Sequence, residues 1–465
     1  MNRVAGKLRF PNNCFEIFND GVYMKTVFLC LLLVIGSGIS AQSINLEQAR
    51  ALALANSRSL ARYEISIRAS ILDERNQLFS MLPQISAGYS VSMNYLHDWQ
   101  FLNPIDTFTA RAELSISQII FQGGKSFIQR AINAISTESI RIDAMTEYFN
   151  VLDSIDNAYY AVLEAGAVLE SEESSLRAAV LGLSIAEIRH SSGMINQGDY
   201  LKALADKETR ENSRNQARRN LAMSMTRFRA LTGITDTLEL EHIVFDDYED
   251  VILRLAGISD EEIPGLIDEF WDIIVVSNPS IAKAGLNRKR AELNLSSAKR
   301  DYAPVISATI FSSGLQYSTT DGFRHNSTGG VTIRGSIPVD FWLMNNRIER
   351  SALARDSAVI DYTGTESSLE IELQNSLLNI ISQAGSVLSS RRSLEYTERH
   401  FDYVMERYRL LQSSVSDLSD ATTLFINSRN NLNRASYAFL QNLSRLRSLC
   451  ALDDEERLIQ ILNGN

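Results

Sequence analysis

Apolar residues recur every seven positions along the segment 125–190. This spacing is typical of a helix that packs along another helix. Proline, which breaks helix interiors, is absent from 105–263 and from the residues after 338. We therefore predict long helices at 125–190 and 346–412, each about 100 Å long at the rise of an α-helix. The first contains two seven-residue rows: Ile128, Ile135, Ile142 and Phe149, and Met145, Leu152 and Tyr159.

Four shorter stretches are also predicted to be helical. At 1.5 Å per residue, each is roughly 35–55 Å long, so two placed end to end would match one long helix. The stretches are 44–81, 200–232, 278–301 and 417–450.

Four other segments alternate apolar and polar residues, as strands with one apolar face do. Each has roughly the length of a tilted strand that crosses a membrane. A soluble sandwich with one solvated face is the alternative interpretation. The third segment alternates less regularly, and we expect a β-bulge there. The predicted strands are 84–96, 107–120, 305–317 and 328–340.

The chain repeats this order of elements twice. Ser59 recurs as Ser280, and Asp199 recurs as Asp417 after an offset of 218 residues. We therefore divide the chain into a first repeat at 42–235 and a second at 278–465. The predicted order in each is helix, strand, strand, long helix, helix.

An acidic insert at 236–277 separates the repeats. Its residues 236–272 contain thirteen Asp or Glu residues and one Arg, Arg254. We interpret the insert as a solvated linker with small helices. The net charge of −11 argues against nucleic acid as a partner.

Residues 1–41 are interpreted as an upstream extension and a secretory signal peptide. The apolar run Val27–Ile35 follows Lys25 and precedes small residues up to Ala41. An N-terminal anchor is the alternative. The mature chain would keep one cysteine, Cys450, and form no internal disulfide. Since no apolar stretch is long enough for a membrane helix, a membrane-spanning form would have to use the strands.

Four strands from one chain cannot close into a barrel. Open edges in hydrocarbon leave backbone groups unpaired, at a cost of several kcal/mol each. We therefore expect an oligomer that shares one barrel of eight, twelve or sixteen strands. The long helices would continue the cylinder outside the membrane.

The chain resembles the TolC-type outer-membrane efflux channel family over essentially its whole mature length. The most specific stretch runs from Asp417 to Leu424. Pro83 and Pro304, which precede strands, and the segment 121–124, which follows one, are also similar to family features. The resemblance implies a mainly α-helical homotrimer with a twelve-stranded β-barrel in the outer membrane and a helical coiled-coil barrel in the periplasm.

The resemblance also implies a function and a set of partners. The trimer would contact outer-membrane lipid and a periplasmic adaptor (membrane fusion) protein, and it would serve an inner-membrane RND or ABC pump. Its function would be passive export of drugs, small molecules or polypeptides in a tripartite efflux or type I secretion system. The cargo and the pump class stay open, and no cofactor is expected.

Two aspartates are the strongest candidates for a periplasmic gate. Asp417 and Asp420 lie three residues apart and share a helix face, so three chains would place six carboxylates around one opening. The alternative is an ordinary helix N-terminus, where aspartate is favoured. The resemblance implies the gate role and adds Asp199 and Tyr408, whose side chains would hold the gate closed.

A basic partner for this gate is missing at its expected position. Ser413 stands where the family pattern has arginine, and Arg407 and Arg409 are possible substitutes on other helix faces. The closing network is therefore in question.

No other pattern indicates chemistry. Gly124-Lys125-Ser126 lacks the upstream glycine of a phosphate-binding loop, because that position is Ile119. The five histidines have no metal-ligand spacing. We therefore predict no enzyme activity. A soluble periplasmic coiled-coil adaptor or scaffold remains as the alternative function, and the irregular strand at 305–317 is the feature that favours it.

Overall fold

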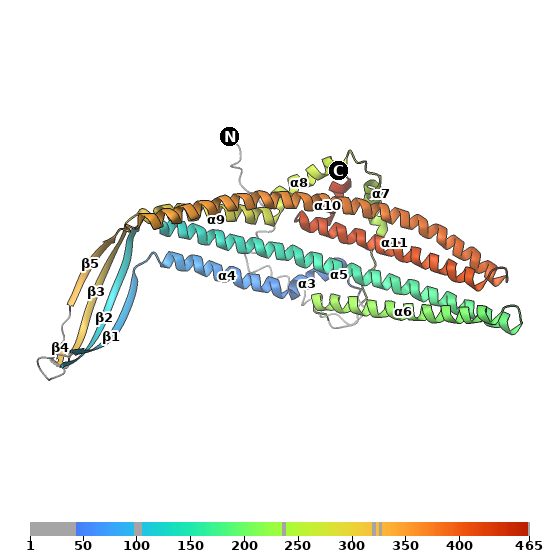
Figure 1. Cartoon of the computed structure of the whole chain (residues 1–465), viewed down its shortest axis with the longest axis horizontal. Helices are drawn as coiled ribbons and strands as arrows, with labels where there is room; N and C mark the ends of the chain where they lie inside the picture. The colour runs from blue at the N-terminus through green and yellow to red at the C-terminus, as the bar shows by residue number, and fades with distance from the viewer. Residues whose placement is uncertain (1–42, 97–104, 235–238, 319–321, 325–327, 464–465) are drawn as a thin grey trace. The chain divides into compact units, whose positions relative to one another are not determined.

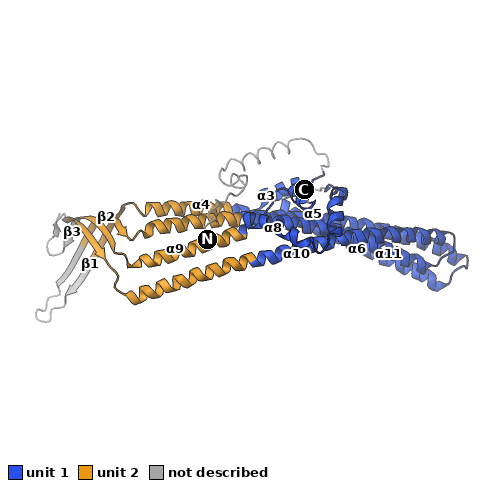
Figure 2. Ribbon diagram, turned by 90° about the horizontal axis from the view of Figure 1, so that it is seen from above, with its two compact units in different colours: residues 1–61, 145–279, 367–465 blue, residues 62–144, 280–366 orange. Residues whose placement is uncertain are grey.

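The computed structural model describes residues 43–96, 105–234, 239–318, 322–324 and 328–463. The signal peptide predicted within 1–41 lies outside them. The chain divides into two compact units (Figure 2). Unit 1 comprises residues up to 61, 145–279 and 367–465, and unit 2 comprises 62–144 and 280–366. Each unit therefore takes segments from both repeats.

Unit 1 is helical. Its core includes the fully buried side chains of Ile155, Phe228 and Leu440. Its elements are α3 (Leu46–Asn56), the second part of α5 (Lys125–Ser191), α6 (Gln197–Thr232), η1 (Phe245–Tyr248), α7 (Glu249–Gly257), α8 (Ile263–Ser277), the second part of α10 (Phe341–Arg409), α11 (Val415–Leu449) and α12 (Glu455–Asn463).

Unit 2 contains the sheet, in the order β1-β2-β3-β5, with the short β4 also on β3 (Figure 1). All these pairs are antiparallel. The strands are β1 (Gln84–Leu96), β2 (Ile105–Gln122), β3 (Val305–Ser318), β4 (Gly322–Arg324) and β5 (Thr328–Ser336). The helices are most of α4 (Arg58–Phe79), the first parts of α5 and α10, α9 (Pro279–Lys299) and the short η2 (Arg300–Tyr302).

The predicted seven-residue rows of the long helix are buried. Ile128, Ile135 and Ile142 are each 7% exposed, and Phe149 is 3% exposed. In the second row, Leu152 and Tyr159 are buried, and Met145 is half-buried. The helix therefore uses this stripe for packing, as the spacing predicted.

The register of the strands places apolar residues on one face of the sheet. Ile116 pairs with Ile85 on one side and Ile310 on the other, and Ile310 also pairs with Val331. Ile85, Ile310 and Val331 are each more than half exposed. The next positions along the strands are polar, as in the pair Ser86–Ser115. In unit 2 the apolar face of the sheet is therefore uncovered.

The predicted β-bulge is present in β3. Gly314 lies between the pairs Ala112–Leu315 and Glu113–Ser313 and has no partner of its own. One inserted residue reverses which alternate positions share a face. This explains why the sequence of this strand alternates less regularly than the others.

Several elements differ from the predictions. The stretch 44–81 forms two helices, because Ser57 between α3 and α4 has an extended backbone. The predicted strand 328–340 ends at Ser336, shortly before Pro338, which has no N–H for a ladder. The C-terminal helix α12 was not predicted.

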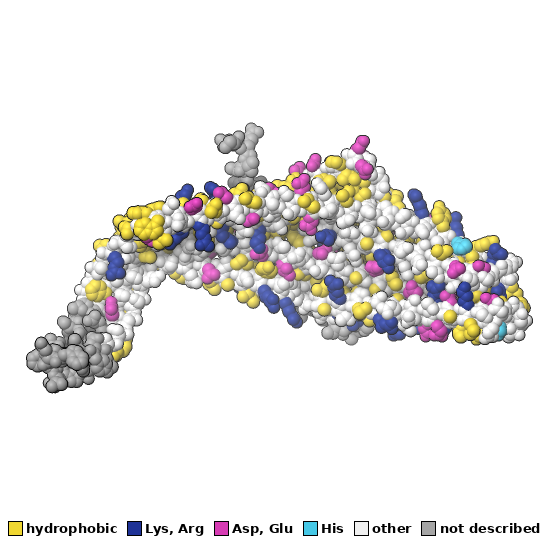
Figure 3. All heavy atoms as spheres, in the orientation of Figure 1, with side chains coloured by type: hydrophobic (Ala, Val, Ile, Leu, Met, Phe, Trp, Pro, Cys, Tyr) yellow, Lys and Arg dark blue, Asp and Glu magenta, His cyan; other side chains and the backbone are white. Residues whose placement is uncertain are grey.

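The acidic insert forms η1, α7 and α8. Its apolar side chains face inward: Val251, Ile252 and Leu255 of α7 and Phe270 of α8 are buried. Its acidic side chains, such as Asp268, are mostly exposed, and some gather over α8 on the face shown in Figure 3. Among the described helices, none is both long and apolar enough to cross a bilayer.

Candidate functional site

Two helix–helix turns of unit 1 occupy equivalent positions in the two repeats. The α5–α6 turn (192–196) and the α10–α11 turn (410–414) are 218 residues apart. Both end their first helix with the same backbone hydrogen bonds, typical of a Schellman motif. The longest-range of these bonds are Met194 N–H to Arg189 O and Gln412 N–H to Arg407 O, each 2.8 Å.

Asp417 caps the start of α11. The Ser414 N–H donates to Asp417 Oδ2 at 2.9 Å, and the Asp417 N–H donates to Ser414 Oγ at 3.1 Å. This is a reciprocal capping box. The hydrogen bonds from Ser414 hold the pKa of the Asp417 carboxyl below its usual range. The side chain is still exposed, so it combines a capping role with a free carboxylate surface.

The other two candidate aspartates also lie near the starts of helices. Asp420 is exposed, one turn further along α11. Asp199 lies at the start of α6, where its N–H donates to Asn196 Oδ1 at 2.9 Å. Lys202 Nζ donates to Ser416 Oγ at 2.8 Å, which brings the beginnings of α6 and α11 together. Asp199 and Asp417 thus lie in the first turns of two neighbouring helices, where the helix dipole stabilises negative charge.

Tyr408, the fourth candidate, is fully buried. Its hydroxyl donates to Gly182 O of α5 at 3.0 Å. Burial holds the pKa of the Tyr408 hydroxyl above its usual value, although the positive charge of Arg189 opposes this rise. A Cβ on Gly182 would lie only 3.1 Å from Leu418 Cδ2, so glycine permits the close packing of α5 against α11. Tyr408 therefore fixes the end of α10 to α5.

Arg189 is the residue that sequence reasoning missed. It lies in the last turn of α5 and is 5% exposed. Its Nη2 donates to Tyr408 O at 2.6 Å, and its Nη1 donates to Ser413 O at 3.1 Å. Its guanidinium carbon is 4.5 Å from the centroid of the Tyr408 ring, a cation–π contact. A basic side chain thus reaches Ser413 from another helix.

The two substitutes considered from sequence lie elsewhere. Arg407 Nη2 donates to Gln412 O within its own turn, and Arg409 lies 4.0 Å from Glu406 on the same helix. The repeat aligns Arg189 with Arg407, and this was the signal in the sequence that could have identified it.

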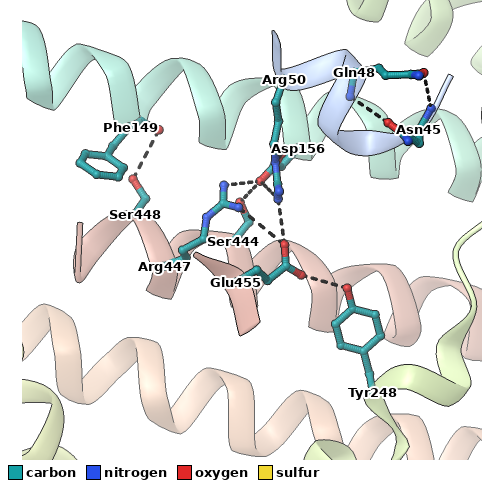
Figure 4. A network of polar contacts seen from close by, with 10 residues as sticks. All are labelled: Asn45, Gln48, Arg50, Phe149, Asp156, Tyr248, Ser444, Arg447, Ser448 and Glu455. Carbon is teal, nitrogen blue, oxygen red and sulfur yellow. Dashed lines mark hydrogen bonds and ion pairs between the residues drawn. The ribbon is translucent and has the colours of Figure 1, made fainter. Parts of the chain in front are cut away.

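A second polar cluster lies in the core of unit 1 (Figure 4). Asp156 of α5 is fully buried. It accepts hydrogen bonds from Arg50 Nε at 2.7 Å, Arg447 Nη2 at 2.7 Å and Ser444 Oγ at 2.7 Å. Three donors satisfy this buried carboxyl group, so the cluster is a structural contact among α3, α5 and α11.

Glu455 extends this cluster to the C-terminal helix. It accepts from Arg50 Nη2 and from the Tyr248 hydroxyl, each at 2.9 Å. Burial, followed by the Glu455 charge, raises the pKa of Tyr248. The cluster therefore also joins η1 and α12. The positive charges of its two arginines are matched by two carboxyl groups, Asp156 and Glu455.

The described residues provide little for a metal or a small ligand. Among them, no group of three or more His, Cys, Asp or Glu side chains is placed to hold a metal ion. A cavity of about 10 Å³ lies among α5, α6, α10 and α11, bordered by Gly182, Asp206 and Tyr408. That volume suits about one water molecule.

Comparison with known proteins gives a consistent result. A model of the family described as outer membrane efflux protein matches residues 49–234 and 272–451, which leaves out most of the acidic insert. The outer membrane protein TolC of Escherichia coli K12 is 21% identical over 472 residues, covering 95% of this chain and 89% of that protein.

Solved structures have the same fold. The Campylobacter jejuni CmeC outer membrane channel matches with a TM-score of 0.71 and 15% identity, over 90% of this chain and 89% of that one. A membrane protein from Pseudomonas aeruginosa matches with a TM-score of 0.73 and 16% identity, over 88% and 91% of the two chains.

Proposed function

Since the chain belongs to the outer membrane efflux protein family, we propose that three copies form an exit duct through the outer membrane. The duct would be passive and would receive its cargo from an inner-membrane pump through a periplasmic adaptor. Drugs, small molecules or polypeptides are the cargo classes. The protein is located in the outer membrane. Its assembly as a trimer and its connection to an adaptor and a pump are what we propose.

The open sheet is the observation that carries this proposal. Within the described sheet, β1 pairs only with β2, and β5 pairs with β3 but with no further strand. Edge strands in hydrocarbon leave a row of unpaired N–H and C=O groups. Pairing β1 of one copy with β5 of the next satisfies both edges, and three copies then give a closed barrel of twelve strands.

The apolar face of the sheet supports a lipid-facing exterior. Ile85 is 72% exposed and Ile333 is 71% exposed, whereas the neighbouring Ser86 and Thr332 are polar. Lipid would cover the apolar face, and the polar face would line a wet lumen. Because the bulge in β3 accounts for its irregular alternation, that strand no longer favours a soluble scaffold.

The acidic side chains at the start of α11 are proposed as the selectivity element. Asp417 and Asp420 are exposed, and three copies would contribute six carboxylates to one opening, which we call the acidic opening. Such a ring attracts cations and repels anions. Asp199 would add to this field, and Tyr408 would hold the adjoining turn.

Ion selectivity in planar bilayers tests the proposal. The double variant Asp417→Asn, Asp420→Asn removes two charges, and the asparagine at 417 can still accept the Ser414 N–H. Under a KCl gradient, the wild-type channel should have a cation-selective reversal potential, and the double variant should shift it towards zero. Asp402→Asn, an exposed change on α10, is the control.

Two results would contradict the proposal. A purified, folded protein that never conducts in bilayers would remove the duct itself. A conducting double variant with wild-type selectivity would keep the duct and remove the acidic opening.

A further inference from the structure

The two equivalent turns have the same backbone path but different residues at the left-handed position. Gly193 has φ 68° in the α5–α6 turn, and Leu411 has φ 65° in the α10–α11 turn. Glycine adopts this conformation without steric cost, whereas leucine places its Cβ too close to the following carbonyl oxygen. The α10–α11 turn is therefore strained where its counterpart is relaxed.

The α5–α6 turn is held by its own residues. His190 Nδ1 lies 3.4 Å from Ile195 O, across the turn. The His190 ring also stacks on Tyr200, with centroids 5.2 Å apart and an interplanar angle of 8°. Ile195 also packs against the apolar cluster that includes Tyr408 of α10 and Val415 of α11, so the polar contacts of this turn are internal whereas its apolar contact is not.

The α10–α11 turn has an internal bond from Arg407 to Gln412 O, and it is also held from outside. The carbonyl equivalent to Ile195 O is Ser413 O, and its donor is Arg189 from α5. The same guanidinium binds Tyr408 O, in the last turn of α10. A buried cation at this point also interacts favourably with the negative end of the α10 dipole.

We propose that Arg189 is a positioning residue of the acidic opening, because it holds the strained α10–α11 turn in place. This turn contains Ser414, the cap of α11, and Asp417 and Asp420 follow directly. Arg189 therefore supplies from α5 the basic contact that position 413 lacks. The expected effect on ions rests on the proposed function. The two bonds from Arg189 to Tyr408 O and Ser413 O, which we call the clamp, can be tested without conduction.

Amide hydrogen exchange tests the clamp, with the α5–α6 turn as an internal reference. In Arg189→Gln, exchange in a peptide covering 409–416 should accelerate by about tenfold or more, as expected for a lost hydrogen bond to a charged group. Exchange in 191–198 should stay unchanged. Arg409→Gln, which removes the same charge from the end of α10 without a bond to α5, should leave both peptides unchanged.

Substitution of Leu411 provides a second experiment, whose result does not depend on whether Arg189→Gln is stable. Leu411→Gly removes the strain, so it should slow exchange in 409–416 by about fivefold while Arg189 is intact. Combined with Arg189→Gln, it should restore much of the lost protection.

The outcomes separate the clamp from the duct. The clamp would be contradicted if exchange at 409–416 were unchanged in Arg189→Gln, or if it accelerated equally in both turns. It would also be contradicted if Leu411→Gly exchanged no more slowly than the wild type at 409–416. If the wild type conducts, Arg189→Gln should also lose cation selectivity, and retained selectivity would overturn the positioning role. If the wild type never conducts, the duct fails and the exchange pattern still decides the clamp.

Discussion

At the scale of single residues, burial separates the charged groups of unit 1 into two kinds. Asp156 and Arg447 are 0% and 2% exposed and bind each other, so their role is to hold helices together. Asp417 and Asp420 are exposed, and we propose that they act on ions. The two kinds lead to different predictions, one on stability and one on pH.

Asp156→Ala should destabilise the protein by about 3–5 kcal/mol, because it removes the carboxylate that lies 2.7 Å from the buried Arg447 cation and leaves Glu455 at 3.6 Å. Urea unfolding followed by circular dichroism measures this. The matched control is Glu372→Ala, which breaks an exposed pair with Arg445 and should cost about 0–1 kcal/mol. Equal, small losses in the two variants would show that the Asp156 cluster does not stabilise the fold.

The cation selectivity of the acidic opening should persist when the pH falls from about 7 to about 5. Hydrogen bonds from Ser414 hold the pKa of Asp417 below its usual range, so its carboxylate stays ionised above that lowered pKa. The stability contributed by this cap is present at neutral pH and is lost only as the pH falls through the lowered pKa. The reversal potential, measured across this pH range, provides the test. Ser414→Ala removes one of the bonds, and its selectivity should decline at a higher pH than that of the wild type.

At the scale of elements, local patterns were predictable and contacts between distant segments were not. The seven-residue rows predicted α5, the absence of proline predicted α10, and the alternation of apolar and polar residues predicted all four long strands. The break at Ser57 was missed because no proline or glycine marks it. The capping alternative for Asp417 was readable from local sequence, whereas the bonds from Arg189 to the α10–α11 turn join residues more than 200 positions apart.

The two faces of β5 provide a matched pair for the membrane assignment. Ile333→Lys puts a charge on the proposed lipid face and should cost about 2–4 kcal/mol near the middle of the bilayer. Thr332→Lys puts the same charge on the proposed lumen side and should be tolerated. The amount of assembled protein in outer-membrane fractions measures both, and equal amounts of the two variants would contradict the assignment of faces.

At the scale of the whole molecule, each compact unit is built from both repeats, so neither repeat forms a unit by itself. The same is true of the sheet, in which β1 and β2 come from the first repeat and β3 and β5 from the second. One chain buries a helical core in unit 1, and in the described sheet both edges are open. Partner copies are the simplest way to close them, which is why the account depends on an oligomer.

The mass of the protein particle, corrected for bound detergent, tests this claim most directly. The mature chain should be extracted from outer-membrane fractions, and light scattering should give the mass of its protein component. A barrel shared by three copies predicts three chains per particle, recovered only with detergent. A single chain, or a particle that stays in solution without detergent, would contradict the shared barrel and with it the exit duct.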